Sequence, residues 1–330
     1  MRALVTGASG FVGVHLTRLL RERGHEVRCL VRPSSRRAHL DQLGVAFHVG
    51  DLSNRRVLRH AIDGCDVVFH CAADYRFQAS APDELYRNNV VGSENLFTAA
   101  ADVGVGRVVY TSSVATLGLS HDGTAASETA PSTLSSMIGA YKRSKFLAER
   151  VADSFVAMRK LPIVIVNPST PVGEDDARPT PTGQFLVDFL SRRIPAYVDT
   201  GLNVIDVRDV AEGHLLAAER GVVGERYILG HRNVTLAELL DMLAQISGVR
   251  WARVHLPHIV PLLAAALEAP LARLRRRPPR VSLEAVRLAR KKMFFDPAKA
   301  VRDLGLPQSP IETALARAVA WFRAQGYVAS

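Results

Sequence analysis

The chain has few cysteines and no long apolar run, and both absences narrow what it can be. Only three of its 330 residues are cysteine, Cys29, Cys65 and Cys71, and they form no CxxC pair. We therefore expect reduced thiols, mostly in the core, with neither a disulfide nor a structural zinc site. No apolar run reaches the roughly 18 residues that a membrane span needs. The first residues read as a strand and not as a charged leader, so we expect a cytoplasmic protein without a signal peptide.

The sequence is strongly basic, but it lacks a set of aromatic residues placed among its arginines, which would be typical of nucleic-acid binding. Its formal net charge is +10, but the arginines are spread over many expected helices. We therefore expect no nucleic-acid partner. A phosphate-bearing small ligand or an anionic membrane surface is a better explanation of the charge, and a generally arginine-rich composition explains it equally well.

Apolar runs of strand length alternate with helical patterns through the first half of the chain. The expected strands are residues 3–6, 26–31, 46–49, 67–71, 108–112 and 163–167. The expected helices are residues 12–23, 36–43, 55–62, 83–103 and 140–159. This alternation predicts an α/β fold with a doubly wound parallel sheet of the Rossmann type, in which ligands bind at the carboxyl ends of the strands.

The second half of the chain does not continue this alternation. We expect residues 1–167 to form a dinucleotide-binding domain and residues 168–330 to form a smaller mixed lobe that binds the substrate. Residues 203–225 are expected to return to the first domain, with residues 203–207 joining its sheet. A final helix is expected near residues 311–322.

A glycine-rich turn directly follows the first expected strand and opens the first expected helix. Residues 7–13 read GASGFVG. A strand, a glycine turn and a helix in this order form a phosphate-binding cradle, because free N–H groups and the positive end of the helix dipole face the anion. Gly7 permits the tight turn, Gly10 lets the backbone approach a pyrophosphate, and Gly13 lets the helix pack closely against the sheet. The expected dinucleotide contacts are Gly7, Gly10, Phe11, Val12 and Gly13.

The end of the second expected strand has no acidic residue, which bears on the choice of cofactor. A carboxylate about twenty residues beyond the glycine turn would bind the ribose 2′-OH of NAD. Arg32 occupies this place, with Arg36 and Arg37 close by. A guanidinium group suits the 2′-phosphate of NADP through forked, charge-assisted hydrogen bonds. We therefore expect NADP(H) to be favoured over NAD(H), bound through Arg32 and Arg36; the alternative is that these arginines only solvate a loop.

Tyr141 and Lys145 lie four residues apart in an expected helix, so they share one helix face. A phenol titrates at a pKa of about 10. An ammonium group about 4 Å away contributes about 4 kcal/mol at an effective dielectric constant near 20, or about three pKa units. Such a shift would suit the tyrosine for general acid–base catalysis. An exposed tyrosine–lysine pair without function is the alternative.

Two further polar residues accompany this pair. Ser113 follows an expected strand and could hydrogen-bond a substrate carbonyl or hydroxyl group, although turn capping is an alternative. Asn89 lies within an expected helix, where asparagine has poor propensity. We expect Asn89 to be buried and to anchor a water molecule or the lysine, and the alternative is an exposed polar residue.

Together these motifs resemble the extended short-chain dehydrogenase/reductase superfamily. The matching segments are residues 6–13, 50–52, 70–73, 89–92, 111–113 and 141–145. By this resemblance Tyr141 is the catalytic acid–base, Lys145 holds the nicotinamide ribose and lowers the pKa of the tyrosine, and Ser113 orients the substrate. The resemblance also implies a homodimer formed through residues 83–103 and 140–159. It implies a catalytic role for Asn89 and cofactor contacts at Asp51, Leu52, Ala72, Ala73, Pro168 and Ser169.

A narrower similarity, to the hopanoid-associated sugar epimerases, extends over nearly the whole chain. It rests on residues 73–76, 113–118, 137–146, 167–171, 179–183, 195–203 and 290–295. It implies an epimerase or oxidoreductase acting on a sugar or a lipid-linked sugar in hopanoid biosynthesis, with dihydroflavonol 4-reductases among the relatives. Leu202 and Asn203 stand where many nucleotide-sugar enzymes carry an arginine for the substrate pyrophosphate. Reduction of an apolar ketone, as in dihydroflavonol reductases or 3β-hydroxysteroid dehydrogenases, is therefore the open alternative.

One apolar segment bears on the membrane. Residues 259–271 are apolar and are followed by Arg273, Arg275, Arg276, Arg277 and Arg280. An apolar element flanked by arginines can rest on an anionic bilayer. It can equally be a core helix with a basic exposed end. Peripheral membrane contact through residues 259–280 is therefore one of two open expectations.

Overall fold

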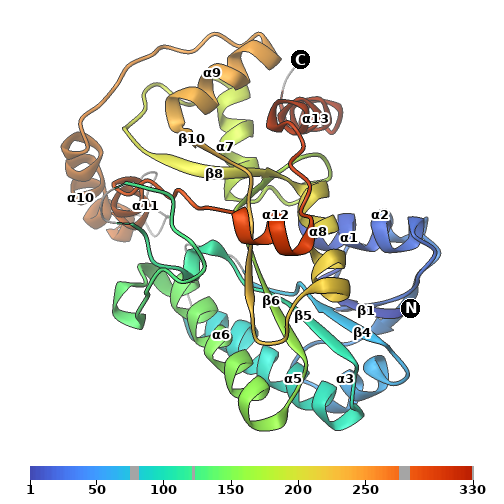
Figure 1. Cartoon of the computed structure of the whole chain (residues 1–330). Helices are drawn as coiled ribbons and strands as arrows, with labels where there is room; N and C mark the ends of the chain where they lie inside the picture. Colours follow the sequence, from blue (N-terminus) through green and yellow to red (C-terminus); the bar gives the residue numbers. More distant parts are fainter. Residues whose placement is uncertain (75–81, 121–122, 275–282, 329–330) are drawn as a thin grey trace.

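Seven parallel strands form the larger sheet, in the order β3-β2-β1-β4-β5-β6-β9 (Figure 1). The structure, a computed structural model, describes residues 1–74, 82–120, 123–274 and 283–328. The order runs outward in both directions from β1, which is the doubly wound arrangement. The strands are β1 (Arg2–Thr6), β2 (Glu26–Val31), β3 (Ala46–Val49), β4 (Val67–His70), β5 (Arg107–Thr111), β6 (Ile163–Pro168) and β9 (Arg226–Leu229).

Helices cover both faces of this sheet (Figure 1). One face carries α1 (Phe11–Glu22), α8 (Val207–Arg220) and α12 (Ala298–Leu304). The opposite face carries α3 (Arg55–Ile62), α5 (Gly92–Val103) and α6 (Gly139–Arg159). The sheet is thus buried on both faces, which explains why its strands are continuous apolar runs.

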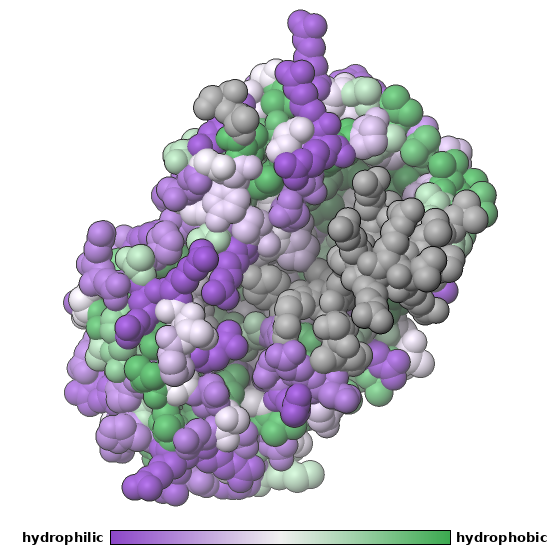
Figure 2. Space-filling model, turned by 180° about the vertical axis from the view of Figure 1, so that it is seen from behind, coloured by the Kyte–Doolittle hydropathy of each residue, from purple (hydrophilic) through white to green (hydrophobic). Residues whose placement is uncertain are grey.

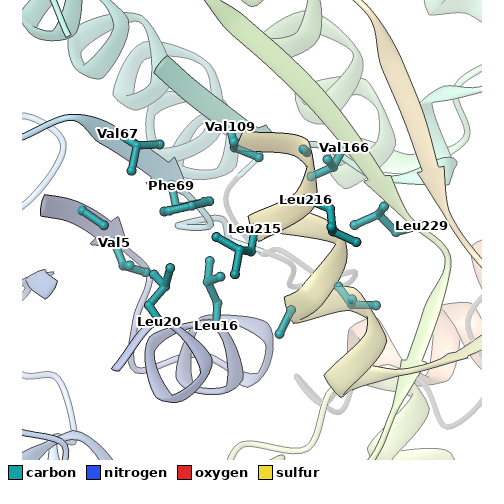
Figure 3. Close-up of a cluster of buried hydrophobic side chains, with 14 of the residues drawn as sticks. Val5, Leu16, Leu20, Val67, Phe69, Val109, Val166, Leu215, Leu216 and Leu229 are labelled. Atoms are coloured by element: carbon teal, nitrogen blue, oxygen red, sulfur yellow. The ribbon is translucent and has the colours of Figure 1, made fainter. Parts of the chain in front are cut away.

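The core on the α1 face shows how the helices are held (Figure 3). Leu16 and Leu20 lie one turn apart on α1, and Leu215 projects from α8 toward them. They meet the sheet at residues such as Phe69, which is fully buried. Each fully buried side chain of this size contributes about 1.5–3 kcal/mol to the free energy of unfolding.

The region expected to be one helix, residues 83–103, is three consecutive elements. These are α4 (Pro82–Tyr86), the π-helix η1 (Arg87–Val91) and α5. A π-helical turn holds one more residue than an α-helical turn, and such turns often occur at functional sites. Shorter elements elsewhere are α2 (Ala38–Asp41) and the 3₁₀ turns η2 (Val114–Thr116) and η3 (Leu134–Ser136).

A second, three-stranded sheet has the order β10-β8-β7. Its strands are β7 (Thr170–Val172), β8 (Gly201–Asp206) and β10 (Arg232–Thr235). They pack with α7 (Pro181–Leu190), α9 (Leu236–Ser247) and α13 (Ile311–Ala324) around a separate apolar cluster. Two further helices, α10 (Ile259–Leu274) and α11 (Leu283–Ala289), contact each other beside this lobe.

The expectation that residues 203–207 join the large sheet is wrong. The strand in this region, β8, pairs with β7 and β10, because β9 already occupies the edge of the large sheet beside β6. The chain returns to the large sheet one element later. Asp206 is the N-cap of α8, and its carboxylate accepts the N–H of Arg208 at 2.9 Å. This helix packs on the large sheet together with α1.

All three cysteines are free thiols; Cys29 and Cys65 are buried, as expected, and Cys71 is half-buried. Within the described ranges, no helix has the length and apolar character needed to cross a membrane.

Candidate active site

The carboxyl edge of the large sheet gathers most of the predicted site residues. Because the strands are parallel, their carboxyl ends lie along one edge, where ligands bind in folds of this type. The residues that follow β1, β2, β3, β4, β5 and β6 at this edge include Gly7, Arg32, Asp51, Ala72, Ser113 and Ser169.

The glycine turn between β1 and α1 is packed against backbone on two sides. Gly7 has a φ of +72°, and a Cβ added there would lie 2.6 Å from the backbone nitrogen of Ala72. A Cβ added at Gly13 would lie 2.1 Å from the carbonyl oxygen of Gly7. Gly13 therefore lets α1 approach the turn itself, and not the sheet as expected from the sequence.

The N-terminus of α1 is suited to an anion. Gly10 is its N-cap, so no side chain caps the helix, and the first turn has no acidic residue. The N–H groups of Phe11, Val12 and Gly13 stand in this first turn, where the helix dipole favours negative charge. A Cβ at Gly10 would meet only the carbonyl oxygen of Gly7, at 3.2 Å, which leaves room on the outer side of the turn. This cradle fits the pyrophosphate of a dinucleotide.

The ends of β2 and β3 bring Arg32 and Asp51 near each other. Arg32 and Arg36 are exposed, and the backbone N–H of Arg32 donates to the hydroxyl of Ser35 at 3.1 Å. The pKa of Asp51 lies below its usual value, first because the Ser53 hydroxyl donates to its carboxylate and also because of the Arg32 charge. Leu52 follows, and its carbonyl accepts from the Asn95 amide at 2.9 Å.

Ser113, Tyr141 and Lys145 converge beyond the end of β5. The Ser113 and Tyr141 hydroxyl groups are joined by a hydrogen bond. The Ser113 hydroxyl also accepts the N–H of Ala115 at 3.1 Å. Lys145 is only 3% exposed, and its ammonium donates to the carbonyl oxygen of Thr111 at 2.7 Å. Its Nζ lies 5.2 Å from the ring centroid of Tyr110.

The pKa of Tyr141 shifts in the direction opposite to the one expected from Lys145. Burial raises the pKa of Tyr141 above its usual value, and the opposing influence is the hydrogen bond from Ser113. Burial also lowers the pKa of Lys145 to about 8. The physical reason is that the ammonium is directed at the Thr111 carbonyl, in a site where desolvation penalises the charged forms of both groups.

Asn89 is buried in the π-helix, but it does not anchor Lys145. Its side-chain oxygen accepts the N–H of Asp74 at 2.7 Å, and its amide donates to the carbonyl of Asp74 at 2.8 Å. The same amide donates to the hydroxyl of Ser144 at 2.9 Å. Asn89 therefore ties the segment that follows Ala72 and Ala73 to α6, one residue before Lys145.

The carboxyl end of β6 supplies a polar atom without a partner. Pro168 is its last residue, and Ser169 follows it with a buried hydroxyl that has no hydrogen-bond partner in the described structure. An orphaned hydroxyl at the ligand-binding edge is consistent with the predicted cofactor contact at Ser169.

Sequence reasoning missed a charged group behind the lysine. Glu149 lies four residues after Lys145 on α6 and is only 1% exposed. It accepts the Ser112 hydroxyl at 2.8 Å and pairs with Arg226, which also binds Asp153 at 2.8 Å. Its spacing of four from Lys145 could have revealed it.

Two cavities differ in their relation to these residues. The larger, of about 620 Å³, lies between α1 and α8 and is lined by charged side chains such as Arg18, Glu22 and Arg208; no predicted site residue lines it. The smaller, of about 50 Å³, adjoins Ser113 and Tyr141 in the chain: Val114, Ala115 and Ile138 line it. Ser113 and Tyr141 do not line the smaller cavity, but their chain neighbours Val114 and Lys142 do, so it is the cavity next to the catalytic candidates in the chain.

A Rossmann-type sheet with a glycine cradle and a serine–tyrosine–lysine cluster at its carboxyl edge defines the class of NAD(P)-dependent enzymes. The chain belongs to the NAD dependent epimerase/dehydratase family, whose model matches residues 3–230. This is the extended short-chain dehydrogenase type that the sequence motifs predict.

Relatives and solved structures match the whole chain. A Synechocystis protein named "Putative dihydroflavonol 4-reductase" is 47% identical over 98% of this chain and 95% of its own length. Sterol demethylase protein B of Methylococcus capsulatus is 35% identical over 99% of this chain and 100% of its own. The crystal structure of gox2253 has a TM-score of 0.90 at 46% identity and covers 99% of both chains. Relatives of this chain thus include proteins named as reductases.

Proposed function

We propose that the protein is an NADP(H)-dependent oxidoreductase that interconverts a ketone and a secondary alcohol on an apolar substrate. The observation that carries this proposal is the lining of the cavity beside Ser113 and Tyr141. Its walls are mostly apolar; they include Leu117, Leu119, Met137, Leu288, Met293 and Phe295. Ser136, Lys142 and Lys291 are its polar lining residues. Walls that are mostly apolar stabilise hydrocarbon and leave most hydroxyl groups of a sugar without hydrogen-bond partners.

The side chains have separate roles in this proposal. The Ser113 hydroxyl donates to the substrate carbonyl oxygen, and the Tyr141 hydroxyl gives its proton to that oxygen as it becomes an alcohol. Lys145 binds the ribose hydroxyls and, as an ammonium, stabilises the phenolate that Tyr141 leaves behind. When bound, the nicotinamide supplies the hydride to the carbonyl carbon. Asn89 positions α6 through Ser144.

The names of three relatives support an apolar substrate. Two of them are described above: the Synechocystis protein named as a putative dihydroflavonol 4-reductase and sterol demethylase protein B. The third is the 4-hydroxy-2-methyl-3-oxo-4-farnesyl-3,4-dihydroquinoline-1-oxide ketoreductase of Stigmatella aurantiaca, which is 34% identical over 92% of this chain and 91% of its own. Ketone reduction on an apolar or isoprenoid-bearing molecule is the chemistry that this last name describes.

The cofactor assignment within this proposal is NADP(H). Arg32 and Arg36 are exposed at the end of β2, where the 2′-phosphate would lie. Gly7, Gly10, Phe11, Val12 and Gly13 hold the pyrophosphate. The remaining cofactor contacts are Asp51, Leu52, Ala72, Ala73, Tyr141, Lys145, Pro168 and Ser169. We further propose a cytoplasmic homodimer formed through η1–α5 and α6.

A sugar or sugar-lipid epimerase of the hopanoid-associated type is the second candidate. A Pseudomonas aeruginosa protein, PA4631, described as a nucleoside-diphosphate-sugar epimerase, has a TM-score of 0.80 at 27% identity over 100% of this chain and 99% of its own. An epimerase would oxidise and reduce the same carbon and retain its cofactor, whereas a reductase releases oxidised cofactor in each turnover.

Cofactor consumption separates the two candidates. The purified protein is incubated with NADPH and either bicyclic and steroid ketones or nucleotide sugars, and NADPH absorbance and products are followed. The proposal expects stoichiometric NADPH oxidation with the ketones. In Tyr141→Phe, turnover should fall by roughly 10²–10⁴-fold while NADPH binding is retained. Epimerised sugar without net NADPH loss would contradict the proposal and support the second candidate.

A further inference from the structure

The first two turns of α10 expose large apolar side chains. Ile259 is 55% exposed, Val260 43% and Leu263 56%. Figure 2, seen from behind, shows hydrophobic residues gathered along the right edge, where α10 lies. Neighbouring exposed aliphatic residues of this size indicate an interaction surface more strongly than isolated ones do.

Positive charge lies next to this apolar face. Arg287, Arg290, Lys291 and Lys292 are all exposed. Lys292 contacts the carboxylate of Asp199 at 3.1 Å, and His258, directly before α10, contacts the carbonyl of the same residue at 3.0 Å. The basic segment and the first turn of α10 therefore meet at one place.

The sequence adds further charge of the same sign. Between residues 259 and 292 there are nine Lys or Arg and only two acidic residues, Glu268 and Glu284. Residues 275–280 of the predicted membrane segment, with four of the arginines, lie outside the described residues. These four arginines add positive charge to the segment, but no position is assigned to them. A surface with apolar side chains beside cations complements an anionic bilayer, which attracts cations and accepts hydrocarbon.

This basic segment is also part of the wall of the small cavity. Leu288, Lys291 and Met293 line the cavity that adjoins Ser113 and Tyr141. One stretch of chain thus borders both the mostly apolar cavity and the surface that carries the exposed cations. A substrate dissolved in a membrane would meet this stretch on leaving the lipid.

We propose that the α10 surface, formed by Ile259, Val260, Leu263, Arg287, Arg290 and Lys292, docks on an anionic lipid bilayer and admits membrane-dissolved substrate to the cavity. The docking is inferred only from the exposure, charge and contacts of these residues. The admission of substrate rests on the proposed function.

Vesicle co-sedimentation tests the docking without any turnover. The full chain is mixed with vesicles of phosphatidylcholine alone or of phosphatidylcholine and phosphatidylglycerol. Binding is expected to the anionic vesicles and to weaken as salt is added. Leu263→Asp and Arg290→Glu should each weaken it about tenfold or more. Val222→Asp is the matched control, because Val222 is 59% exposed on the loop between α8 and β9, and it should bind as the unchanged protein does.

Three outcomes would overturn the docking proposal. These are no binding to anionic vesicles, equal binding to both vesicle types, and equal loss in Leu263→Asp and Val222→Asp. Dissociation of a dimer by Leu263→Asp, without vesicle binding, would assign the surface to a second copy of the chain. Ketone turnover in detergent-free buffer, measured in parallel, reports on the proposed function separately. If docking holds, Leu263→Asp should lower turnover of vesicle-embedded ketone but not of a water-soluble one.

Discussion

Glu149 lies one helical turn beyond Lys145 on α6, and its buried charge raises the pKa of Lys145 against the lowering that burial causes. Glu149 is itself held by the Ser112 hydroxyl and by Arg226, which is shared with Asp153. Cys71 is the other group whose charge would raise the pKa of Lys145, and Thr111 binds the ammonium through its carbonyl. Glu149 is thus the acidic side chain that supports the charge of the lysine.

Replacement of Glu149 by Gln should move the alkaline limb of kcat/KM to lower pH. The pKa of Lys145 is about 8, and loss of a nearby negative charge lowers it further. The ammonium is then lost at a lower pH, by about 1–2 pH units. A pH profile of kcat/KM measures the shift. Glu149→Asp keeps the negative charge, so its alkaline limb should lie close to that of the unchanged protein. Glu94→Gln, at an exposed glutamate, is the control. An unmoved limb in Glu149→Gln would remove the electrostatic role.

Substitutions at two glycines of the turn should have separate effects, one on the stability of the fold and the other on cofactor binding. In Gly13→Ala the new Cβ would stand 2.1 Å from the Gly7 carbonyl oxygen and 2.9 Å from the Ala8 Cα, and backbone atoms yield poorly. We expect a loss of about 1–3 kcal/mol in the free energy of unfolding. In Gly10→Ala the nearest contact is 3.2 Å, so stability should stay close to normal while NADPH binding weakens. Thermal unfolding and NADPH titration of both variants measure this, and equal melting temperatures would count against the packing argument.

The large sheet was predictable because its strands are buried on both faces. Six expected strands, from residues 3–6 to 163–167, are confirmed within two residues, since continuous apolar runs mark parallel strands. The seventh, β9 (Arg226–Leu229), was not expected, because it lies in the second half of the chain, where strands and helices no longer alternate regularly. The partners of β8 depend on which strand occupies the edge beside β6, and local sequence does not encode that contact.

The site was predictable in its residues more than in its contacts. The hydrogen bond between Ser113 and Tyr141 joins two residues that the motifs had singled out. The poor helix propensity of Asn89 singled out this residue, but it did not predict the π-helix in which Asn89 lies. Nor did it predict the partners of its side chain, Ser144 and Asp74. The Thr111 carbonyl that binds Lys145 is a backbone atom, so no residue type could reveal it.

Arg32 should set the preference for NADPH over NADH. Its guanidinium is exposed at the end of β2, and each charge-assisted hydrogen bond to a 2′-phosphate contributes about 1.5–3 kcal/mol. In Arg32→Ala the ratio of the two dissociation constants should fall roughly ten- to a hundredfold, with NADH binding little changed. Arg56→Ala, at an exposed arginine of α3, is the matched control. An unchanged ratio in Arg32→Ala would refute the assignment.

His214 should make the fold sensitive to acid. It is fully buried on α8, where Nδ1 lies 2.7 Å from the Val210 carbonyl oxygen and Nε2 lies 2.8 Å from the Thr111 hydroxyl. Burial lowers its pKa to about 4. The folded protein therefore binds this proton less readily than the unfolded chain, whose histidines titrate near pH 6.5. The contribution of neutral His214 to the free energy of unfolding is complete above about pH 6.5. It is lost as the pH falls toward 4, by up to about 3 kcal/mol.

Chemical denaturation between pH 7 and pH 4 measures this contribution. The difference in the free energy of unfolding between the unchanged protein and His214→Gln should shrink as the pH falls, because the variant has no imidazole to protonate. His39→Gln, at an exposed histidine of α2, should follow the unchanged protein at every pH. A pH-independent difference between His214→Gln and the unchanged protein would show that His214 stabilises the fold only through packing and hydrogen bonds.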